Sequence, residues 1–285
     1  MADAHRVDTV GADSSSAPTV FFLSDSTGIT AETLGNTLLT QFPSRRLERR
    51  TIPFITSVEQ AHEVVAVIDK LAAEGPRPII FSTTVGNDIR AVLSQSRGHF
   101  FDLFGAHIGQ LEHALHASAS GQPGQAHGVG DAARYQSRMA AVEYAIEHDD
   151  GQSVRALERA ELILIAPSRC GKTPTSMYLA LQHGIKVANY PLVEEDFRSS
   201  DLPRPIRAYA ERCFGLVSTA ARLSQVRGER RPGSTYASLA QCSYELRRAE
   251  ALYHHHRIPS INSASMSVEE MAAVIMQIRR MNNLA

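Results

Sequence analysis

The hydrophobic pattern of the first hundred residues alternates between two periods. Short unbroken apolar runs, typical of buried strands, precede longer segments whose apolar residues recur at helical spacing. A strand that leads into a helix, repeated along the chain, is typical of a parallel sheet. The elements predicted here are a strand at 20–23, a helix with Leu34, Leu38 and Phe42 on one face, a helix at 62–73 with Val64, Ile68 and Leu71 aligned, and a strand at 78–81.

The second half of the chain repeats this alternation after a stretch of different composition. Residues 117–131 are rich in Ala, Ser, Gly and Gln, which is typical of a flexible linker or exposed loop. Near the C-terminus, Ser267 and Glu270 form a capping-box pattern that opens a helix. The predicted elements are strands at 162–165, 186–190, 214–218 and 258–262, and helices at 133–148, through Met177 and Leu181 to a stop at Gly184, at 234–253, and through Met271, Ile275 and Ile278.

These patterns predict an α/β fold in which parallel sheets are flanked by helices. The change of composition near residue 117 divides the chain into two domains. We expect a polar, disordered tail at 1–18, an N-terminal α/β domain at 19–116, a linker or loop at 117–131 and a C-terminal nucleotide-binding domain at 132–285.

Composition and charge exclude several classes of protein. The 285-residue chain is 43% hydrophobic, yet it has no apolar run near the ~20 residues of a membrane span and no signal-peptide pattern. Three widely spaced cysteines, Cys170, Cys213 and Cys242, fit a reducing cytoplasm and argue against a disulfide framework or zinc site. A formal net charge of −1 gives no case for nucleic acid binding. We therefore expect a cytoplasmic protein without membrane or nucleic acid partners, of an oligomeric state that the sequence does not set.

The strongest chemical signal follows the apolar run at 162–165. Gly171, Lys172 and Thr173 match the end of the phosphate-binding P-loop pattern, whereas Ala166 stands where that pattern begins with Gly. A glycine here lets backbone N–H groups turn toward phosphate oxygens, and the following helix presents its positive N-terminus to the same anion. The residues predicted to cradle the nucleotide phosphates are Ala166, Pro167, Ser168, Arg169, Cys170, Gly171, Lys172 and Thr173.

Two side chains of this loop have predicted chemical roles. Lys172 would reach the terminal phosphates, and the Thr173 hydroxyl would be a ligand of Mg²⁺. The chain has 29 Lys and Arg residues, but only Lys70, Lys172 and Lys186 are lysines, so a lysine at this position is a distinctive choice. The alternative is a chance Gly-Lys-Thr at a helix start. The surrounding strand and helix favour a C-terminal half that resembles a P-loop kinase.

A second loop, at 24–28, also lies between a predicted strand and a predicted helix. Its Ser24, Ser26, Thr27 and Gly28 would form a second phosphate site through hydroxyl and backbone N–H groups. The alternative is an ordinary capped helix start, because Ser, Asp and Thr all favour that position.

Carboxylates near the P-loop are candidates for proton transfer and metal binding. Residues 148–151 read His-Asp-Asp-Gly, and phosphoryl transfer needs a carboxylate to accept the proton of the nucleophile. Asp149 or Asp150 would fill that role, or the tetrad is an exposed turn. The acidic run at 194–196 would supply a metal ligand or, more simply, begin an exposed helix.

Two further runs favour an unremarkable interpretation. The three adjacent histidines at 254–256 point in different directions on a helix, which argues against a shared metal ion. The basic runs at 45–50 and 227–231 are typical of solvated faces, with docking of an acidic partner as the alternative.

Four segments resemble the bacterial phosphoenolpyruvate synthase regulatory proteins and, equally, the pyruvate, phosphate dikinase regulatory proteins. These segments are 22–33, 148–151, 166–180 and 186–193, and the likeness extends from about Val20 to the C-terminus. The departures are Ala166 and Pro167, where members of the family more often begin the loop with Gly, and the low-complexity insert at 117–130.

The resemblance implies a bifunctional enzyme. One activity transfers the β-phosphoryl group of ADP to a threonine of the target enzyme, which inactivates the target and leaves AMP. The other removes that group with inorganic phosphate and releases pyrophosphate. Mg²⁺, phosphate and phosphoenolpyruvate synthase, or pyruvate, phosphate dikinase in its place, are the implied partners. A small-molecule P-loop kinase and a non-catalytic nucleotide-sensing module remain as alternatives from the residues alone.

Overall fold

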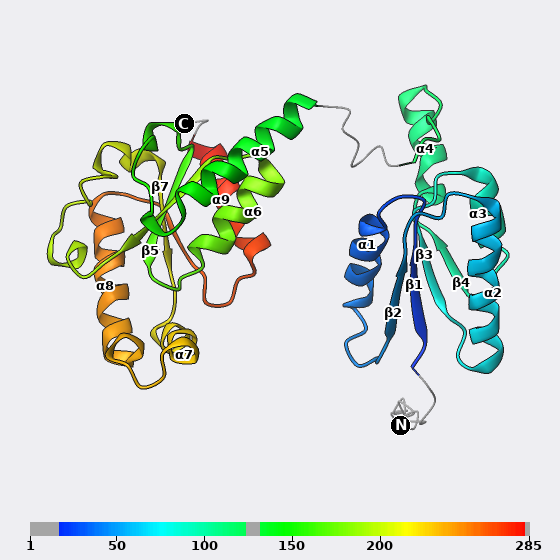
Figure 1. Cartoon of the computed structure of the whole chain (residues 1–285), viewed down its shortest axis with the longest axis horizontal. Coiled ribbons are helices and arrows are strands. Elements are labelled where there is room, and N and C mark those ends of the chain that lie inside the picture. The colour runs from blue at the N-terminus through cyan, green and yellow to red at the C-terminus, as the bar shows by residue number, and fades with distance from the viewer. Residues whose placement is uncertain (1–16, 124–131, 283–285) are drawn as a thin grey trace, which may run out of the picture. The chain divides into compact units, whose positions relative to one another are not determined.

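The computed structural model describes residues 17–123 and 132–282 of the chain. Contacts divide the chain into two compact units, Met1–Gly130 and Asp131–Ala285, and each unit has its own sheet (Figure 1). Each unit is therefore described by itself.

The N-terminal unit alternates strands and helices throughout. Its elements are β1 (Thr19–Leu23), α1 (Ile29–Leu39), β2 (Glu48–Ile52), α2 (Val58–Glu74), β3 (Ile79–Ser82), α3 (Asn87–Leu93), β4 (His99–Asp102) and α4 (Gly105–Leu115).

The C-terminal unit has the same alternation with more helix. Its helices are α5 (Ala132–Glu147), α6 (Lys172–His183), α7 (Ala220–Arg230), α8 (Leu239–His255) and α9 (Val268–Asn282). Its strands are β5 (Leu162–Pro167), β6 (Val187–Leu192), β7 (Cys213–Val217) and β8 (Ser260–Asn262). Short 3-10 turns are η2 (Asp149–Gly151), η3 (Leu157–Arg159), η4 (Asp196–Arg198), η5 (Arg207–Arg212) and η6 (Thr235–Ala237).

The two sheets share one strand order. Each has four parallel strands, in the order β2-β1-β3-β4 in the N-terminal unit and β6-β5-β7-β8 in the C-terminal unit. The first strand of each unit thus pairs with the second on one side and with the third on the other. In such doubly wound sheets the chain changes direction between these two neighbours, and ligands bind at the carboxyl edge of that point. The loops after β1 and β5 lie at this edge.

Alternate side chains of β1 supply two separate cores in the N-terminal unit. Val20 and Phe22 pack with Ala31 and Leu39 of α1, whereas Phe21 packs on the opposite face. Figure 1 shows α1 on one side of the sheet and α2 with α3 on the other. Because neighbouring strand residues point to opposite faces, a central strand covered by helices on both sides is apolar throughout.

The central strand of the C-terminal unit is buried over its whole length. All residues of β5 are buried, and α5, α6 and α9 lie on one face of the sheet with α7 and α8 on the other (Figure 1). From α8, the Tyr253 hydroxyl donates a 2.8 Å hydrogen bond to the Ile165 carbonyl. A Cβ at Gly215 would lie 2.5 Å from the Tyr253 ring, so β7 needs glycine where this ring crosses it. These contacts fix the position of the end of β5, which leads into the predicted phosphate loop.

The predicted fold class is confirmed: the protein is α/β, with parallel sheets flanked by helices. The predicted strands form β1, β3 and β5 to β8, and the Ser267–Glu270 capping box is present, with the Glu270 backbone N–H donating to Ser267 Oγ at 3.2 Å. The helix predicted from Ser234 begins later, since Ser238 caps α8 and a separate short turn precedes it.

Sequence patterns missed β2, α3, β4, α4 and α7. The strand β2 lies at the sheet edge and reads Glu-Arg-Arg-Thr-Ile, with four exposed residues, so it has no apolar signal. The helix α7 buries only Leu223 and Arg227. Elements that bury little apolar surface leave little periodicity to detect.

The aligned Leu34, Leu38 and Phe42 do not belong to the core. They are exposed, because α1 turns Ala31, Gly35 and Leu39 toward the sheet. A Cβ at Gly35 would lie 2.5 Å from the Phe22 ring, so the helix packs through its small residues.

Arg227, expected on a solvated basic face, is fully buried. Of the expected linker, residues 117–123 contain no helix or strand, and 124–131 lie outside the described residues. The expected tail lies there as well, up to residue 16. No helix within 17–123 or 132–282 is long and apolar enough to cross a bilayer.

Candidate phosphate-binding site

The predicted P-loop lies between β5 and α6. Residues 168–171 connect the carboxyl end of β5 to the first turn of α6, with Gly171 at the N-cap of the helix. Gly171 has a φ of 90° and Arg169 a φ of 74°, both in the left-handed region. These turns bend the backbone around the helix N-terminus, where unpaired N–H groups and the helix dipole favour an anion. Ala166 is the last-but-one residue of β5, so the departure from glycine falls in strand rather than in the turn.

Lys172 is folded inward under this loop. Its side chain is buried, and its Nζ donates to the carbonyl oxygens of Ala166 at 3.2 Å and Pro167 at 3.3 Å. Burial lowers the pKa of the Lys172 ammonium, and the nearby Cys170, Asp150 and Asp149 oppose that shift. Besides these carbonyl oxygens the ammonium has, among the described residues, only the exposed Asp150 carboxylate, 3.9 Å away, so it lacks a close counter-charge that a phosphate group would supply.

Asp149 lies beside the start of α6 and contacts two partners. Thr173 Oγ1 donates to Asp149 Oδ1 at 2.8 Å, and the Asn189 side-chain amide donates to the same oxygen. Asn189 comes from β6, the neighbour of β5, and is itself buried. The sequence analysis gave Asn189 no role, although it lies in the family-like segment 186–193, because its contact with Asp149 follows from strand pairing. The predicted Mg²⁺ ligand Thr173 is therefore paired with a carboxylate.

Asp150 is arranged differently from its neighbour. Its carboxylate is exposed, and Asp150 Oδ1 lies 3.9 Å from Lys172 Nζ. Its backbone N–H donates to Asn189 Oδ1 at 2.6 Å, and its φ of 51° puts it in the left-handed region. The predicted tetrad thus places one carboxylate against Thr173 and one above Lys172.

The residue at the head of the tetrad supports the turn. His148 is buried, with Nδ1 2.8 Å from the Tyr144 carbonyl oxygen and Nε2 2.6 Å from the Arg155 carbonyl oxygen. Its ring stacks on Tyr144 with centroids 3.9 Å apart. His148 therefore fixes the backbone that carries the carboxylates and does not face the loop.

A buried arginine that the sequence did not single out as functional holds the other side of the loop. Arg227 donates from Nη2 to the Ser168 carbonyl at 3.0 Å and to Glu245 Oε2 at 2.6 Å. Its guanidinium carbon lies 4.1 Å from the centroid of the Tyr236 ring, and the Tyr236 hydroxyl donates to Ser168 Oγ at 3.0 Å. Both α7 and α8 are thereby tied to the phosphate loop.

The space in front of the loop is a pocket of about 260 Å³. It is smaller than the ~300–1,000 Å³ of typical ligand pockets, so it suits the phosphate end of a nucleotide. Its lining includes the loop, the Asp150 carboxylate and two residues of α7. The lining residues are Asp150, Ser168, Arg169, Gly171, Lys172, Thr173, Pro174, Val226 and Arg230.

The second predicted phosphate site has a different local structure. Ser24 is buried, and its Oγ accepts from the Ser26 backbone N–H at 3.1 Å and from Thr83 Oγ1 at 3.2 Å. The buried Asp25 carboxylate accepts from the backbone N–H groups of Val85 at 2.6 Å and Gly86 at 3.3 Å. The Asp25 carboxylate therefore already occupies the N-terminus of α3 as an anion. Phosphate binding by Ser24, Ser26, Thr27 and Gly28 stays a prediction.

The remaining sequence candidates do not converge on the phosphate loop. Glu194 is exposed and pairs with Arg198 at 2.9 Å, and Asp196 Oδ2 accepts from the Val193 backbone N–H at 3.0 Å. His256 Nε2 lies 2.9 Å from the Ser200 carbonyl oxygen. Among residues 17–123 and 132–282, no cluster of three or more His, Cys, Asp or Glu side chains could hold a metal ion.

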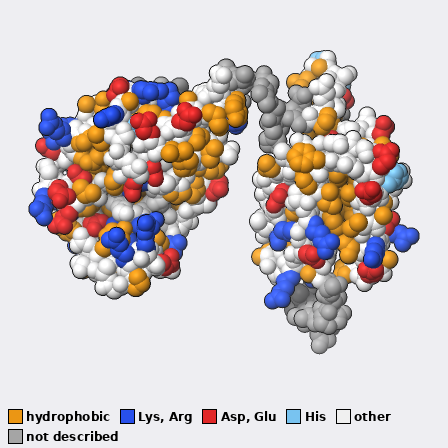
Figure 2. All heavy atoms as spheres, in the orientation of Figure 1, with side chains coloured by type: hydrophobic (Ala, Val, Ile, Leu, Met, Phe, Trp, Pro, Cys, Tyr) orange, Lys and Arg blue, Asp and Glu red, His pale blue; other side chains and the backbone are white. Residues whose placement is uncertain are grey.

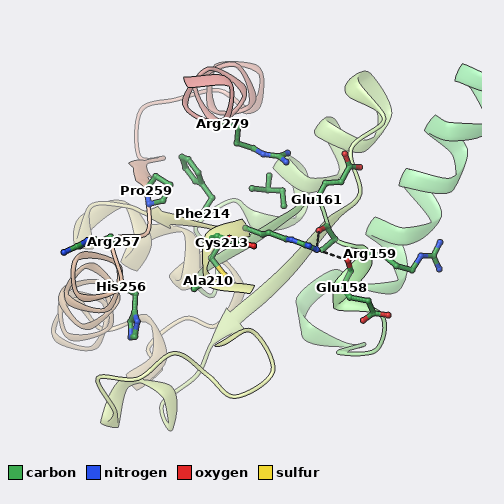
Figure 3. Close-up of a pocket in the computed structure, with 14 residues that line it drawn as sticks. Glu158, Arg159, Glu161, Ala210, Cys213, Phe214, His256, Arg257, Pro259 and Arg279 are labelled. Atoms are coloured by element: carbon green, nitrogen blue, oxygen red, sulfur yellow. Dashed lines mark hydrogen bonds between the residues drawn. The ribbon is translucent and has the colours of Figure 1, made fainter. Parts of the chain in front are cut away.

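A second pocket of about 830 Å³ lies at the amino ends of β5 and β7. It mixes Arg159, Arg212, Arg257 and Arg279 with Glu158, Glu161 and Glu211. In Figure 3, Arg159 and Arg257 point away from the pocket on opposite sides. Arg212 is committed to the structure, since its Nη1 donates to the carbonyls of Glu158 at 2.8 Å and Ala160 at 3.0 Å. Compared with the loop after β5, this end of the sheet is a poorer anion site.

The chain is similar to known proteins over most of its length. The kinase/pyrophosphorylase family matches residues 20–276 of the chain. A Pseudomonas aeruginosa protein named "Putative phosphoenolpyruvate synthase regulatory protein" is 46% identical over 259 residues, 90% of this chain and 94% of that protein. Proteins of the same name from Hahella chejuensis and Legionella pneumophila (strain Corby) are 45% and 46% identical, and each match covers 91% of this chain and 96% of the relative.

Proposed function

Because this chain belongs to the kinase/pyrophosphorylase family, we propose that it regulates phosphoenolpyruvate synthase by reversible phosphorylation. In one direction it transfers the β-phosphoryl group of ADP to a threonine of the synthase and releases AMP. In the other it removes that group with inorganic phosphate and releases pyrophosphate. The observation that carries the proposal is the buried Lys172 beneath a phosphate loop, with the Asp150 carboxylate 3.9 Å from its Nζ.

The forward step needs a base, a cation and a positioned donor. The threonine Oγ of the target attacks the β-phosphorus of ADP, and the bond from that phosphorus to the bridging oxygen breaks, which leaves AMP. Asp150 accepts the hydroxyl proton, because its carboxylate is exposed at the mouth of the pocket. Lys172 offsets the negative charge that builds on the transferred group.

The residues present fit a Mg²⁺ ion. Thr173 Oγ1 and Asp149 Oδ1 are oxygen donors 2.8 Å apart at the start of α6. Mg²⁺ prefers oxygen ligands and usually binds through one or two carboxylates together with substrate phosphates, so a larger cluster of acidic residues is not required. Thr173 and Asp149 would hold the ion, which would neutralise phosphate charge. The two carboxylates of the tetrad then have separate roles.

The reverse step makes different demands on the same side chains. Orthophosphate attacks the phosphorus of phosphothreonine, the bond to the threonine oxygen breaks, and that oxygen takes a proton back from Asp150. The attacking phosphate already carries negative charge, so positioning matters more than a strong base. Lys172 would neutralise phosphate charge in this direction as well.

An assay with two purified target enzymes tests the proposal. The protein is incubated with ADP and phosphoenolpyruvate synthase, and AMP release and threonine phosphorylation are followed together. Pyruvate, phosphate dikinase is the parallel target, and ATP in place of ADP is the parallel donor. Stoichiometric AMP and phosphothreonine on the synthase are expected. Turnover of a small-molecule acceptor with ATP, or ADP binding without turnover on either target, would instead favour a small-molecule kinase or a nucleotide-sensing module.

A further inference from the structure

The mouth of the phosphate pocket has more positive charge than the P-loop motif explains. Arg169 and Arg230 line it together with Lys172, and Asp150 is the only carboxylate in its described lining. Figure 2 shows Lys and Arg side chains gathered near α7 on the face of the C-terminal unit that is in view. Such an excess of cations suits a group with more than one negative charge, or two anionic groups that meet there.

Arg230 is positioned by α7, which is bound to the loop through Arg227. Arg227 is fully buried and binds the Ser168 carbonyl through both Nε, at 3.3 Å, and Nη2, at 3.0 Å. Val226 and Arg230 both line the pocket and are four residues apart, so they lie on one face of α7. Arg227, the residue after Val226, lies on a neighbouring face of α7 and contacts the loop through the Ser168 carbonyl. The same helix therefore binds the loop through Arg227 and places Arg230 at the mouth of the pocket.

The two arginines at the mouth have no partner of their own. Within the described ranges, neither the Arg169 nor the Arg230 guanidinium has a hydrogen bond, an ion pair or an aromatic ring contact. Other arginines of α7 are engaged, since Arg222 donates to Gln225 at 3.2 Å and Arg227 is paired with Glu245. Arg169 also has a φ of 74°, which is unfavourable for a residue with a Cβ. Strain of this kind persists where the surrounding structure requires it, often at functional sites.

We propose that Arg169 and Arg230 bind the terminal phosphoryl group, which is the β-phosphoryl of ADP before transfer and the phosphothreonine phosphate afterwards. The inference rests on the proposed function. A guanidinium presents several N–H donors in a planar fork that matches phosphate oxygens, and it remains charged throughout. Contact with the equatorial oxygens of the transferred group adds stabilisation as charge spreads over them, in addition to that from Lys172. No proton moves to or from either arginine.

Binding of ADP and AMP tests this assignment without requiring turnover. Arg230→Ala and Arg169→Ala are compared with Arg231→Ala, an exposed neighbour outside the pocket lining, and melting temperatures confirm folding. We expect Arg230→Ala and Arg169→Ala each to weaken ADP binding about tenfold or more, because a hydrogen-bonded charge pair is lost. AMP, which lacks the terminal phosphoryl, is expected to bind all variants equally. Arg230→Lys should lie between, since it keeps the charge but loses the fork.

The transfer rate adds a second, independent measure. Arginines that contact a transferred phosphoryl raise kcat by about 10³–10⁵-fold in related chemistry, so Arg230→Ala should lower kcat by at least about 10²-fold. Equal losses of ADP and AMP affinity would overturn the assignment, because the effect would then be on the loop as a whole. Unchanged ADP binding and rate in both alanine variants would overturn it as well. If the wild-type protein binds ADP through these arginines yet phosphorylates no target, the proposed function fails while the phosphoryl site stands.

Discussion

The loops after β1 and β5 occupy the same position in two sheets of identical strand order, yet they hold opposite charges. The loop after β5 encloses the Lys172 ammonium. The loop after β1 carries the buried Asp25 carboxylate, which accepts from the backbone N–H groups of Val85 and Gly86 just before α3. Topology therefore places a polar loop and a helix N-terminus at both edges, whereas the buried charged side chain there is a lysine in one unit and an aspartate in the other.

The comparison also separates two uses of the same turn chemistry. Gly28 and Gly171 both have left-handed φ values, 79° and 90°, and each is the N-cap of the helix that follows. In the N-terminal unit the surrounding hydroxyls bond to each other, as Thr83 Oγ1 does to Ser24 Oγ. In the C-terminal unit Thr173 Oγ1 donates to the Asp149 carboxylate, and Ser168 Oγ accepts from the Tyr236 hydroxyl. A strand followed by a polar turn and a helix thus predicts the carboxyl edge of the sheet, but it does not predict what that edge binds.

The largest expected effect comes from removing the cation. Lys172→Ala should abolish phosphoryl transfer from ADP, because loss of a charge-stabilising group costs roughly 3 kcal/mol or more of transition-state stabilisation. A control substitution in the other loop, Ser26→Ala, should leave that rate near wild type. Initial rates with ADP and the target measure both. Near-normal transfer by Lys172→Ala, or equal losses in the two variants, would end the distinction between the loops.

Substitution of the carboxylates at the two edges should change different quantities: transfer rate or Mg²⁺ requirement for the C-terminal unit, and stability for the N-terminal unit. Asp150→Asn removes the base and should slow transfer about 10²–10⁴-fold, while ADP binding survives and phosphorolysis suffers less. Asp149→Asn should raise the Mg²⁺ concentration needed, since Asp149 pairs with Thr173. Asp25→Asn should lower stability by about 1–3 kcal/mol without slowing transfer, because a charged acceptor of buried N–H groups is weakened.

Rates, Mg²⁺ titrations and urea unfolding separate these three outcomes. Full transfer activity in both Asp149→Asn and Asp150→Asn would reduce the tetrad to a turn. The base would then be sought among Asp25, Glu194, Glu195 and Asp196.

Matched glycine substitutions test the turns themselves. A Cβ at Gly28 would lie 3.0 Å from Thr51 Cγ2, and one at Gly171 would lie 3.4 Å from Met271 Cε. Alanine at either position should destabilise the protein by about 1–2 kcal/mol, because both backbones are left-handed. Only Gly171→Ala should also weaken ADP binding. Thermal unfolding and ADP titration check this, and parallel losses of ADP affinity would favour a nucleotide site at both loops.

The smallest effect is expected at the position that departs from the P-loop pattern. Ala166→Gly removes a single Cβ inside β5, which should cost at most about 1 kcal/mol of stability and leave ADP binding intact. Isothermal titration with ADP measures this directly. A collapse of affinity would mean that the Ala166 methyl group shapes the loop after β5 in a way that has no equivalent after β1.

Local sequence determined the strand, the turn and the helix start at the phosphate site. The buried run of β5 is apolar because helices cover both faces of its sheet, and Gly171-Lys172-Thr173 follows three residues after the strand ends. These features depend on neighbours in the chain, so periodicity and turn chemistry suffice to predict them. The same reasoning could not foresee the contacts of Asp25 in the loop at 24–28, since Asp25 finds its partners about sixty residues away.

Only the tertiary structure decided which side chains complete the site. Asn189 reaches Asp149 from forty positions along the chain, because β6 pairs with β5. Arg227 reaches Ser168 from fifty-nine positions away, and the same helix brings Arg230 to the pocket mouth. Sequence alone treated 227–231 as a solvated basic run, because α7 has little apolar periodicity. Burial, charge partners and the meeting of distant residues are properties of packing, which no local pattern encodes.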